Sequence, residues 1–143
     1  MRTFAFETVD VFTSQRFGGN PLAVFPEASG LADGEMQQLA AEFNLSETTF
    51  VLPPADPAHT ARVRIFNRSH EMPFAGHPMV GTAFVLASRR AEVPETFTFE
   101  VPAGLVRIRL MRAAGAVTGA EIDAPRPLVT GVTLTTEHIA ASI

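Results

Sequence analysis

Two short segments contain the side chains best suited to chemistry. The first is residues 44–50, Asn-Leu-Ser-Glu-Thr-Thr-Phe, where Glu47 lies between a predicted helix end and an apolar strand. A carboxylate beside Leu45 and Phe50 could be partly desolvated and suited to proton transfer near neutral pH. The alternative is an exposed glutamate at the start of a strand, which composition alone favours.

The second segment is residues 71–78, Glu-Met-Pro-Phe-Ala-Gly-His-Pro, which leads into an apolar helix. Amides at the start of a helix lack helical partners and carry the positive end of the dipole, so they can bind a substrate carboxylate. Gly76 has no side chain to block a ligand, and Pro78 suits the first helical position because its missing amide hydrogen would have no partner there. The alternative is that Gly-x-Pro only marks the boundary before a helix, where this pattern is common, and binds no ligand.

Two further polar residues are open to a functional and a structural interpretation. His77 could donate a hydrogen bond or a proton to a ligand, or it could be an N-cap whose ring is satisfied by the backbone. Asn20 could bind the ligand, although a residue in the sequence Gly-Gly-Asn-Pro ordinarily serves a turn. The residue pattern alone leaves both alternatives open at each position.

Two helices are predicted to hold these segments in place. Residues 33–43 should form an amphipathic helix with Asp33 as its N-cap and Asn44 as a left-handed C-terminal residue. The second helix, residues 78–87, has Thr82 as its only polar side chain, and a helix that is apolar all round is normally buried. We therefore expect the second helix at the centre of the fold.

Short strands are predicted around these helices. Aromatic and β-branched runs indicate strands at residues 4–12, 22–25, 48–52 and 61–66, a hairpin at 96–101 and 105–111, and a short strand at 121–124. A last helix should begin at Thr135 or Thr136. Strands and helices that wrap a buried helix give an α+β class. We interpret residues 1–125 as one lobe and residues 126–143 as a crossover into a further lobe.

The bulk composition narrows the function classes. Of the 143 residues, 46% are hydrophobic and 18% are charged, as in one globular domain. The net charge of −4 argues against nucleic-acid binding. No apolar run approaches the roughly 20 residues that cross a bilayer, so no membrane partner is expected. The N-terminus lacks the features of a signal peptide, which makes a cytoplasmic location the default.

The cysteine and histidine content narrows the chemistry further. There is no cysteine, which excludes disulfides, thiolate nucleophiles and cysteine-based metal sites. The four histidines show no metal-ligand spacing such as H-E-x-x-H. No metal site is therefore expected.

Four segments together resemble one family. Residues 9–13, 19–24, 44–51 and 71–78 match, in order and spacing, the PhzF (phenazine biosynthesis-like) isomerases, whose fold is that of diaminopimelate epimerase. The resemblance implies a lobe in which a rolled, mostly antiparallel sheet surrounds a central helix. It also implies an isomerase that needs no cofactor and moves protons on a small carboxylate-bearing metabolite.

The resemblance assigns roles to individual residues. It implies that Glu47 acts as acid and base and that Gly76 and His77 position the substrate. We predict Glu47 and His77 as catalytic residues, and Asn20, Ser46, Gly76, His77 and Pro78 as substrate-binding residues. The related diaminopimelate epimerases and proline racemases use two opposed cysteines instead. A chain without cysteine cannot use that two-cysteine mechanism.

The sequence also departs from the family pattern. Asn67-Arg68 follows Phe66 where the family usually reads Phe-Thr-Pro, and Met79 replaces a threonine. A second-lobe segment of the type Asp-Pro-Val-Thr-Gly-Ser is absent. The leading hypothesis is an isomerase lobe whose site is completed by a complementary C-terminal half or by another copy in a homodimer. The alternatives are a non-catalytic small-anion-binding lobe or assembly subunit, and a truncated inactive fragment.

Overall fold

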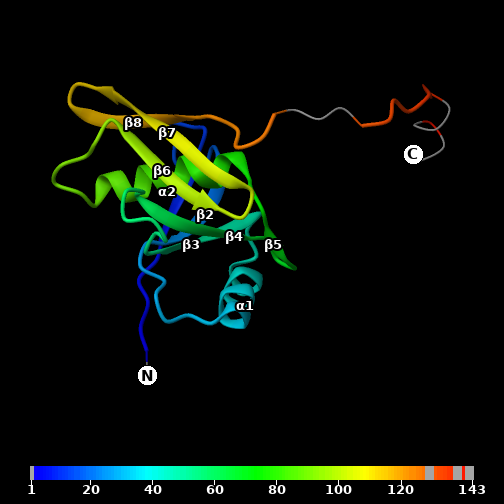
Figure 1. The fold of residues 1–143 in the computed structure, drawn as a ribbon, viewed down its shortest axis with the longest axis horizontal. Helices are drawn as coiled ribbons and strands as arrows, with labels where there is room; N and C mark the ends of the chain where they lie inside the picture. The colour runs from blue at the N-terminus through cyan, green and yellow to red at the C-terminus, as the bar shows by residue number, and fades with distance from the viewer. Residues whose placement is uncertain (1, 128–130, 137–139, 141–143) are drawn as a thin grey trace.

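The computed structural model describes residues 2–127, 131–136 and 140. Ten helices and strands follow one another along these residues (Figure 1). In chain order they are β1 (Glu7–Val11), β2 (Asn20–Phe25), α1 (Asp33–Phe43), β3 (Glu47–Leu52), β4 (Ala61–Phe66), β5 (Glu71–Met72), α2 (Gly76–Ser88), β6 (Thr96–Val101), β7 (Gly104–Ala113) and β8 (Ala116–Ile122).

The strands form one mixed sheet that curls around α2. Its order is β1-β2-β3-β4-β6-β7-β8, and β5 pairs with β4 off this path. The pairs β2–β3 and β4–β6 are parallel and the other pairs are antiparallel. Helix α2 contacts both end strands, β1 and β8, which requires the sheet to be rolled. The expected α+β fold, a rolled and mostly antiparallel sheet around a central helix, is confirmed.

The sheet has two apolar faces, each covered by one helix. On the inner face Met79, Ala83 and Leu86 of α2 pack among residues of the surrounding strands. On the outer face Met36 and Ala40 of α1 pack in a smaller cluster rich in phenylalanine. Because neighbouring strand residues point to opposite faces, β2, β3 and β4 supply buried residues to both clusters, such as Val51 to the inner one and Phe50 to the outer one.

A close approach between α2 and the first strands depends on Gly81. A Cβ atom there would lie 2.6 Å from Leu22 Cδ2 and 2.7 Å from Val11 Cγ2, both in buried side chains. A larger residue would force the helix and strands apart. Gly81 therefore sets the spacing between α2 and the strands β1 and β2.

Both helix starts differ from the sequence expectation. The N-cap of α1 is Ala32 rather than Asp33, and the Ala32 amide donates to Glu35 Oε2 at 2.8 Å. Helix α2 begins at Gly76, so Pro78 is its third residue rather than its first. Both differences have the same cause. The first turn of any helix leaves several amides free, so capping residues and proline fit more than one of its positions. Asn44 ends α1 with a left-handed backbone, φ 54°, as predicted.

The outer strands also differ in length from the prediction. Strand β1 starts at Glu7 instead of residue 4, and β8 starts at Ala116 instead of residue 121. The extension of β8 arises from pairing with β7 across a turn at Ala114 and Gly115, both of which have positive φ. The helix expected from Thr135 or Thr136 falls mainly on residues outside the described ones. Within the described residues, no helix has the length and apolar character needed to cross a membrane.

Candidate active site at the start of helix α2

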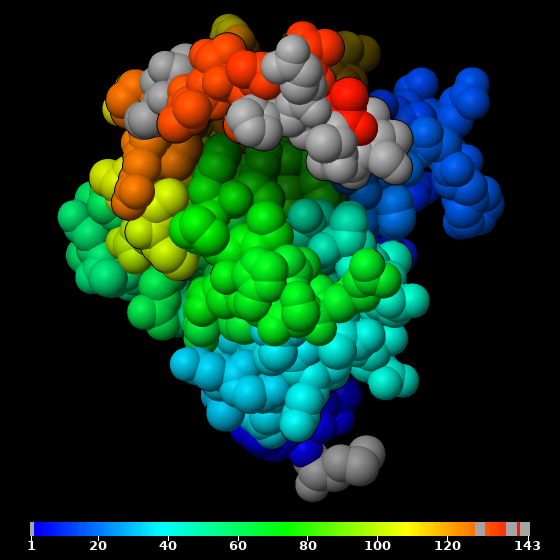
Figure 2. Space-filling view, turned by 90° about the vertical axis from the view of Figure 1, so that its right-hand side faces the viewer, coloured from blue at the N-terminus to red at the C-terminus, as the bar shows by residue number. Residues whose placement is uncertain are grey.

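The topology brings the predicted site residues to one edge of the sheet. Strands β2 and β3 run parallel, and they begin at Asn20 and Glu47, with Leu22 opposite Glu47 in the register. Their starting ends therefore lie side by side. Figure 2 views the end of the lobe where the green residues around β5 and the start of α2 lie near α1, shown in cyan.

Four of these residues form a continuous chain of contacts. Ser46 Oγ donates to Asn20 Oδ1 at 3.0 Å, and Asn20 Nδ2 lies 3.3 Å from His77 Nδ1. On the other side of the ring, His77 Nε2 lies 3.3 Å from Glu47 Oε2. Because the Asn20 amide nitrogen can only donate, Nδ1 is the acceptor and neutral His77 carries its proton on Nε2, facing Glu47.

The Glu47–His77 contact is buried but lacks the alignment of a hydrogen bond. The two side chains are 15% and 9% exposed. Among the described residues, the buried side-chain polar atoms without a hydrogen-bond partner are Glu47 Oε2, His77 Nε2 and Thr48 Oγ1. Buried polar atoms normally have partners, so two orphan atoms facing each other indicate a site built for a ligand or for proton transfer.

Burial also sets the charge of His77. Desolvation lowers the pKa of His77 below its ordinary value of 6.5, and the nearby Glu47 carboxylate only partly opposes this. The ring is therefore neutral at pH 7 and can donate through Nε2. A neutral donor beside a carboxylate is an arrangement suited to orienting a substrate while the carboxylate moves a proton.

The first turn of α2 offers an open backbone. Its N-cap is Ala75, which makes no side-chain cap, and no acidic residue lies in the first turn. A Cβ atom on Gly76 would meet nothing closer than Ile122 Cδ1 at 3.8 Å. The free amides and the helix dipole therefore face a region that an anionic group can reach. Gly76 and Pro78 occupy this turn together with His77.

Phe12 is a neighbour of the site that sequence analysis did not select. Its ring centroid lies 6.5 Å from that of His77, and the residue is 74% exposed. Its φ of 64° is unusual for a bulky residue, and such strain clusters at functional sites. The only signal in the sequence is its position within the segment 9–13.

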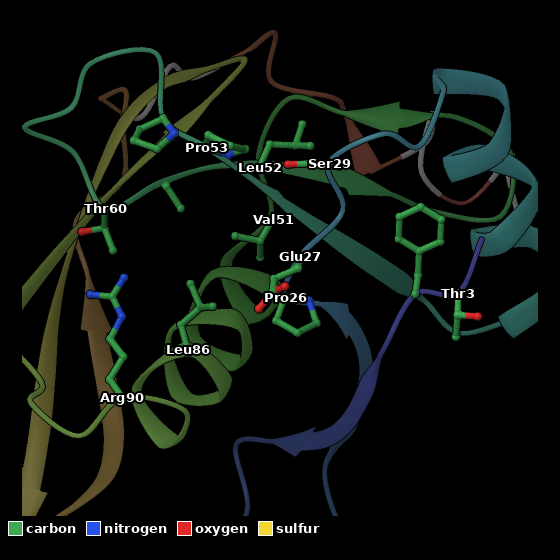
Figure 3. Close-up of a pocket in the computed structure, with 13 residues that line it drawn as sticks. Thr3, Pro26, Glu27, Ser29, Val51, Leu52, Pro53, Thr60, Leu86 and Arg90 are labelled. Carbon is green, nitrogen blue, oxygen red and sulfur yellow. The ribbon is translucent and has the colours of Figure 1, made fainter.

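A larger cavity lies away from this site. Its volume is 440 Å³, and Leu86 and Arg90, near the other end of α2, point into it (Figure 3). The cavity shares no residue with the Glu47–His77 pair. His77 and Leu86 are about 14 Å apart along the helix, at about 1.5 Å per residue. The cavity and the predicted site are therefore separate features. The described residues include no group of three or more His, Cys, Asp or Glu side chains placed to hold a metal ion.

Comparison with known proteins identifies the family. The model of the PhzC-PhzF family, described as phenazine biosynthesis-like protein, matches residues 9–142. The chain belongs to this family. An uncharacterized isomerase of Mesorhizobium japonicum is 48% identical over 132 residues, which cover 90% of this chain and 43% of that protein. The trans-2,3-dihydro-3-hydroxyanthranilate isomerase of Pseudomonas chlororaphis is 40% identical over 124 residues, which cover 87% and 44%.

Solved structures give the same family and fold. The phenazine biosynthesis protein of the PhzF family from Bacillus anthracis superimposes with a TM-score of 0.72 at 33% identity, covering 80% of this chain and 38% of that one. A hydroxyproline epimerase of Agrobacterium vitis, at 16% identity and a TM-score of 0.59 over 73% and 38% of the two chains, shares the fold alone. The chain spans less than half the length of the relatives it matches.

Proposed function

We propose that this chain forms one lobe of a cofactor-independent isomerase that transfers a proton between two carbons of a small carboxylate-bearing metabolite. The observation that carries the proposal is the buried Glu47–His77 pair, whose facing atoms lie 3.3 Å apart and make no hydrogen bond. A carboxylate without a donor keeps its lone pairs available for a proton. Family membership and relatives that are named isomerases support the same reaction type.

The proposed reaction uses Glu47 in both directions. The carboxylate removes a proton from one carbon and becomes a carboxylic acid. It then returns a proton to a different carbon and is regenerated as a carboxylate, so no proton or electron is gained or lost overall. Neutral His77 donates its Nε2 hydrogen to the substrate, and Asn20 and Ser46 hold the ring in the required tautomer. The substrate carboxylate binds at the first turn of α2, beside Gly76 and Pro78.

The substrate class follows from the relatives and from the site. One relative is named for its action on trans-2,3-dihydro-3-hydroxyanthranilate, a small ring bearing a carboxylate. The free amides of α2 suit such an anion. Because the matched relatives are more than twice as long as the matched region, the proposal includes a second lobe that closes the site. That lobe belongs either to a complementary C-terminal half or to another copy of this chain.

Deuterium exchange tests the proposal. The protein, in the assembly identified by native mass spectrometry, is incubated in D₂O with trans-2,3-dihydro-3-hydroxyanthranilate and a panel of small carboxylates. We expect deuterium at carbon for the native protein and a loss of about 10²- to 10⁴-fold in Glu47→Gln, the range for a general acid–base residue. Glu42→Gln is the matched control, because Glu42 lies exposed on α1.

The outcomes separate the competing functions. Exchange at the native rate in Glu47→Gln would remove Glu47 from the acid–base role. Thermal stabilisation by a carboxylate without any exchange would favour the non-catalytic anion-binding lobe, for which the uncapped start of α2 is the supporting observation. Equal melting temperatures of the native and variant proteins are the control for folding.

A further inference from the structure

Arg64 forms the densest polar contact on the outer face of the sheet. Its Nε and Nη2 donate to Glu71 Oε1 and Oε2 at 2.7 and 2.6 Å, and its Nη1 donates to Asp33 Oδ1 at 2.5 Å. The Arg64 side chain is only 18% exposed, and its guanidinium lies over the Phe66 ring, 5.0 Å from the centroid. A planar, bidentate and partly buried contact fixes its partner in orientation as well as distance.

The partner of this contact is the segment that presents His77. Glu71 begins β5, which has two residues and pairs only with β4. A ladder this short holds its strand weakly by backbone pairing alone. Beyond β5 the Ala103 amide donates to the Pro73 carbonyl at 3.1 Å, and Phe74 and Ala75 pack against the inner core. His77 then follows in the first turn of α2.

We propose that Arg64 is a positioning residue of the candidate site, which holds Glu71 and β5 so that the connection to α2 places His77 beside Glu47. The kinetic part of this inference rests on the proposed function. The structural part does not, because it concerns only where the His77 ring lies.

The geometry of Arg64 separates this role from general stability. The guanidinium serves two partners with different nitrogens, Glu71 through Nε and Nη2 and Asp33 through Nη1. The Asp33 contact reaches α1, whereas the Glu71 contact reaches the segment that leads to His77. Loss of the Asp33 contact should leave His77 in place, whereas loss of the Glu71 contact should displace it. Lysine has one ammonium group and cannot bind both oxygens of Glu71 in this planar way.

Three substitutions test the proposal. Arg64→Lys and Glu71→Gln weaken the bidentate contact, whereas Asp33→Asn weakens only the contact to α1. Arg62→Lys is the matched control, because Arg62 is an exposed arginine two residues away on the same strand. The readouts are ¹⁵N NMR titration of the His77 ring and, where the native protein is active, kcat and KM for exchange.

We expect Arg64→Lys and Glu71→Gln to shift the His77 titration upward, towards that of an ordinary histidine. Burial is the cause that lowers the pKa of His77, and a loosened first turn admits water. The charged side chain within ion-pair distance of His77 is Glu47, and none of these variants changes it. We also expect kcat to fall about 10- to 100-fold with little change in KM, because small misplacements of a catalytic group carry costs of this size.

The result that would overturn the inference is an unchanged His77 titration in both variants, even if both lower the melting temperature. An equal shift in Asp33→Asn would also overturn it, because the effect would then be one of general stability. If the native protein shows no exchange, the proposed function fails. The His77 titration then still decides the positioning role.

Discussion

Among the residues that the structure describes, two glutamate–histidine pairs differ in their hydrogen bonding. Glu100 of β6 accepts from the amides of Ala55 and Asp56 at 2.8 and 2.9 Å, and its Oε1 lies 2.8 Å from His59 Nδ1. These donors lower the pKa of Glu100 to about 2. Glu47 faces His77 at 3.3 Å with no hydrogen bond between them.

The two pairs contain the same residue types and differ in their hydrogen-bond partners. The lone pairs of Glu100 are occupied by backbone donors, so this carboxylate holds residues 55–59 against β6 and resists protonation. Glu47 Oε2 and His77 Nε2 are buried without partners, so they remain available to a substrate. Both pairs contain the same two residue types, so residue type alone gives no reason to prefer one pair.

We expect the largest effect from a substitution that displaces His77 from Glu47 and leaves the His59–Glu100 pair in place. Gly81 lies one turn beyond His77 in α2, and a Cβ there would meet Leu22 and Val11 at 2.6 and 2.7 Å. We expect Gly81→Ala to lower the free energy of unfolding by about 1–3 kcal/mol, the usual cost of overpacking. It should also change the NMR signals of His77 but not those of His59. Urea unfolding and histidine NMR check both effects.

The matched control is Gly34→Ala in α1. A Cβ on Gly34 would meet nothing within 4 Å, and the residue lies in a helix. Alanine should therefore leave stability unchanged or raise it by about 0.4–1 kcal/mol. If Gly81→Ala proved as stable as the native protein, the close approach of α2 to β1 and β2 would not be needed to place His77.

A second effect concerns the Glu100–His59 pair and the stability of the folded protein at acidic pH. The pKa of Glu100 is lowered from 4.5 to about 2 in the folded protein, so the unfolded chain binds more protons between these values. The stabilisation is complete above pH 4.5 and is lost as pH falls towards 2. We expect Glu100→Gln to lower the melting temperature at neutral pH and to flatten the decline of stability below pH 4.5.

Urea unfolding across this acid range measures the effect. Glu92→Gln is the control, because Glu92 is exposed between α2 and β6. An unchanged acid profile in Glu100→Gln would mean that the backbone donors do not stabilise the charged carboxylate. Exchange activity, where present, should be retained in Glu100→Gln, in contrast to Glu47→Gln.

Local sequence patterns predict much of the fold. The near absence of polar residues between Met79 and Ala87 predicts the buried helix, and alternating residues predict the hairpin of β6 and β7. Strand β8 is longer than its residues suggest because Ala116, Val117 and Gly119 pair with β7, with Thr118 at an irregularity in the register. Their own strand preference is mixed, and the tertiary pairing decides.

The candidate site was predictable in its residues but not in its geometry. Glu47 and His77 stand in motifs that the sequence shows directly. Their contact depends on the packing of α2 against β3, which no local pattern specifies. The Arg64–Glu71 contact and the approach of Phe12 to His77 are also tertiary, and in sequence these residues resemble ordinary strand and turn residues.

The smallest effect tests whether Glu47 and His77, the pair at the candidate site, influence each other. Burial lowers the pKa of His77, and the negative charge of Glu47 raises it in part. Replacing Glu47 with Gln removes the opposing charge while nearly preserving shape, so the pKa of His77 should fall further. Because an unfolded histidine titrates near 6.5, the stability that His77 contributes is present above this pH and is lost as pH falls below it.

NMR titration of the His77 ring in Glu47→Gln measures this shift, with Glu100→Gln as the control that should leave His77 unchanged. A rise in the pKa of His77, or no change, would show that the ring does not sense the Glu47 charge. The 3.3 Å approach would then be a packing contact without electrostatic coupling. A further fall would show electrostatic coupling between Glu47 and His77 across a contact that has no hydrogen bond.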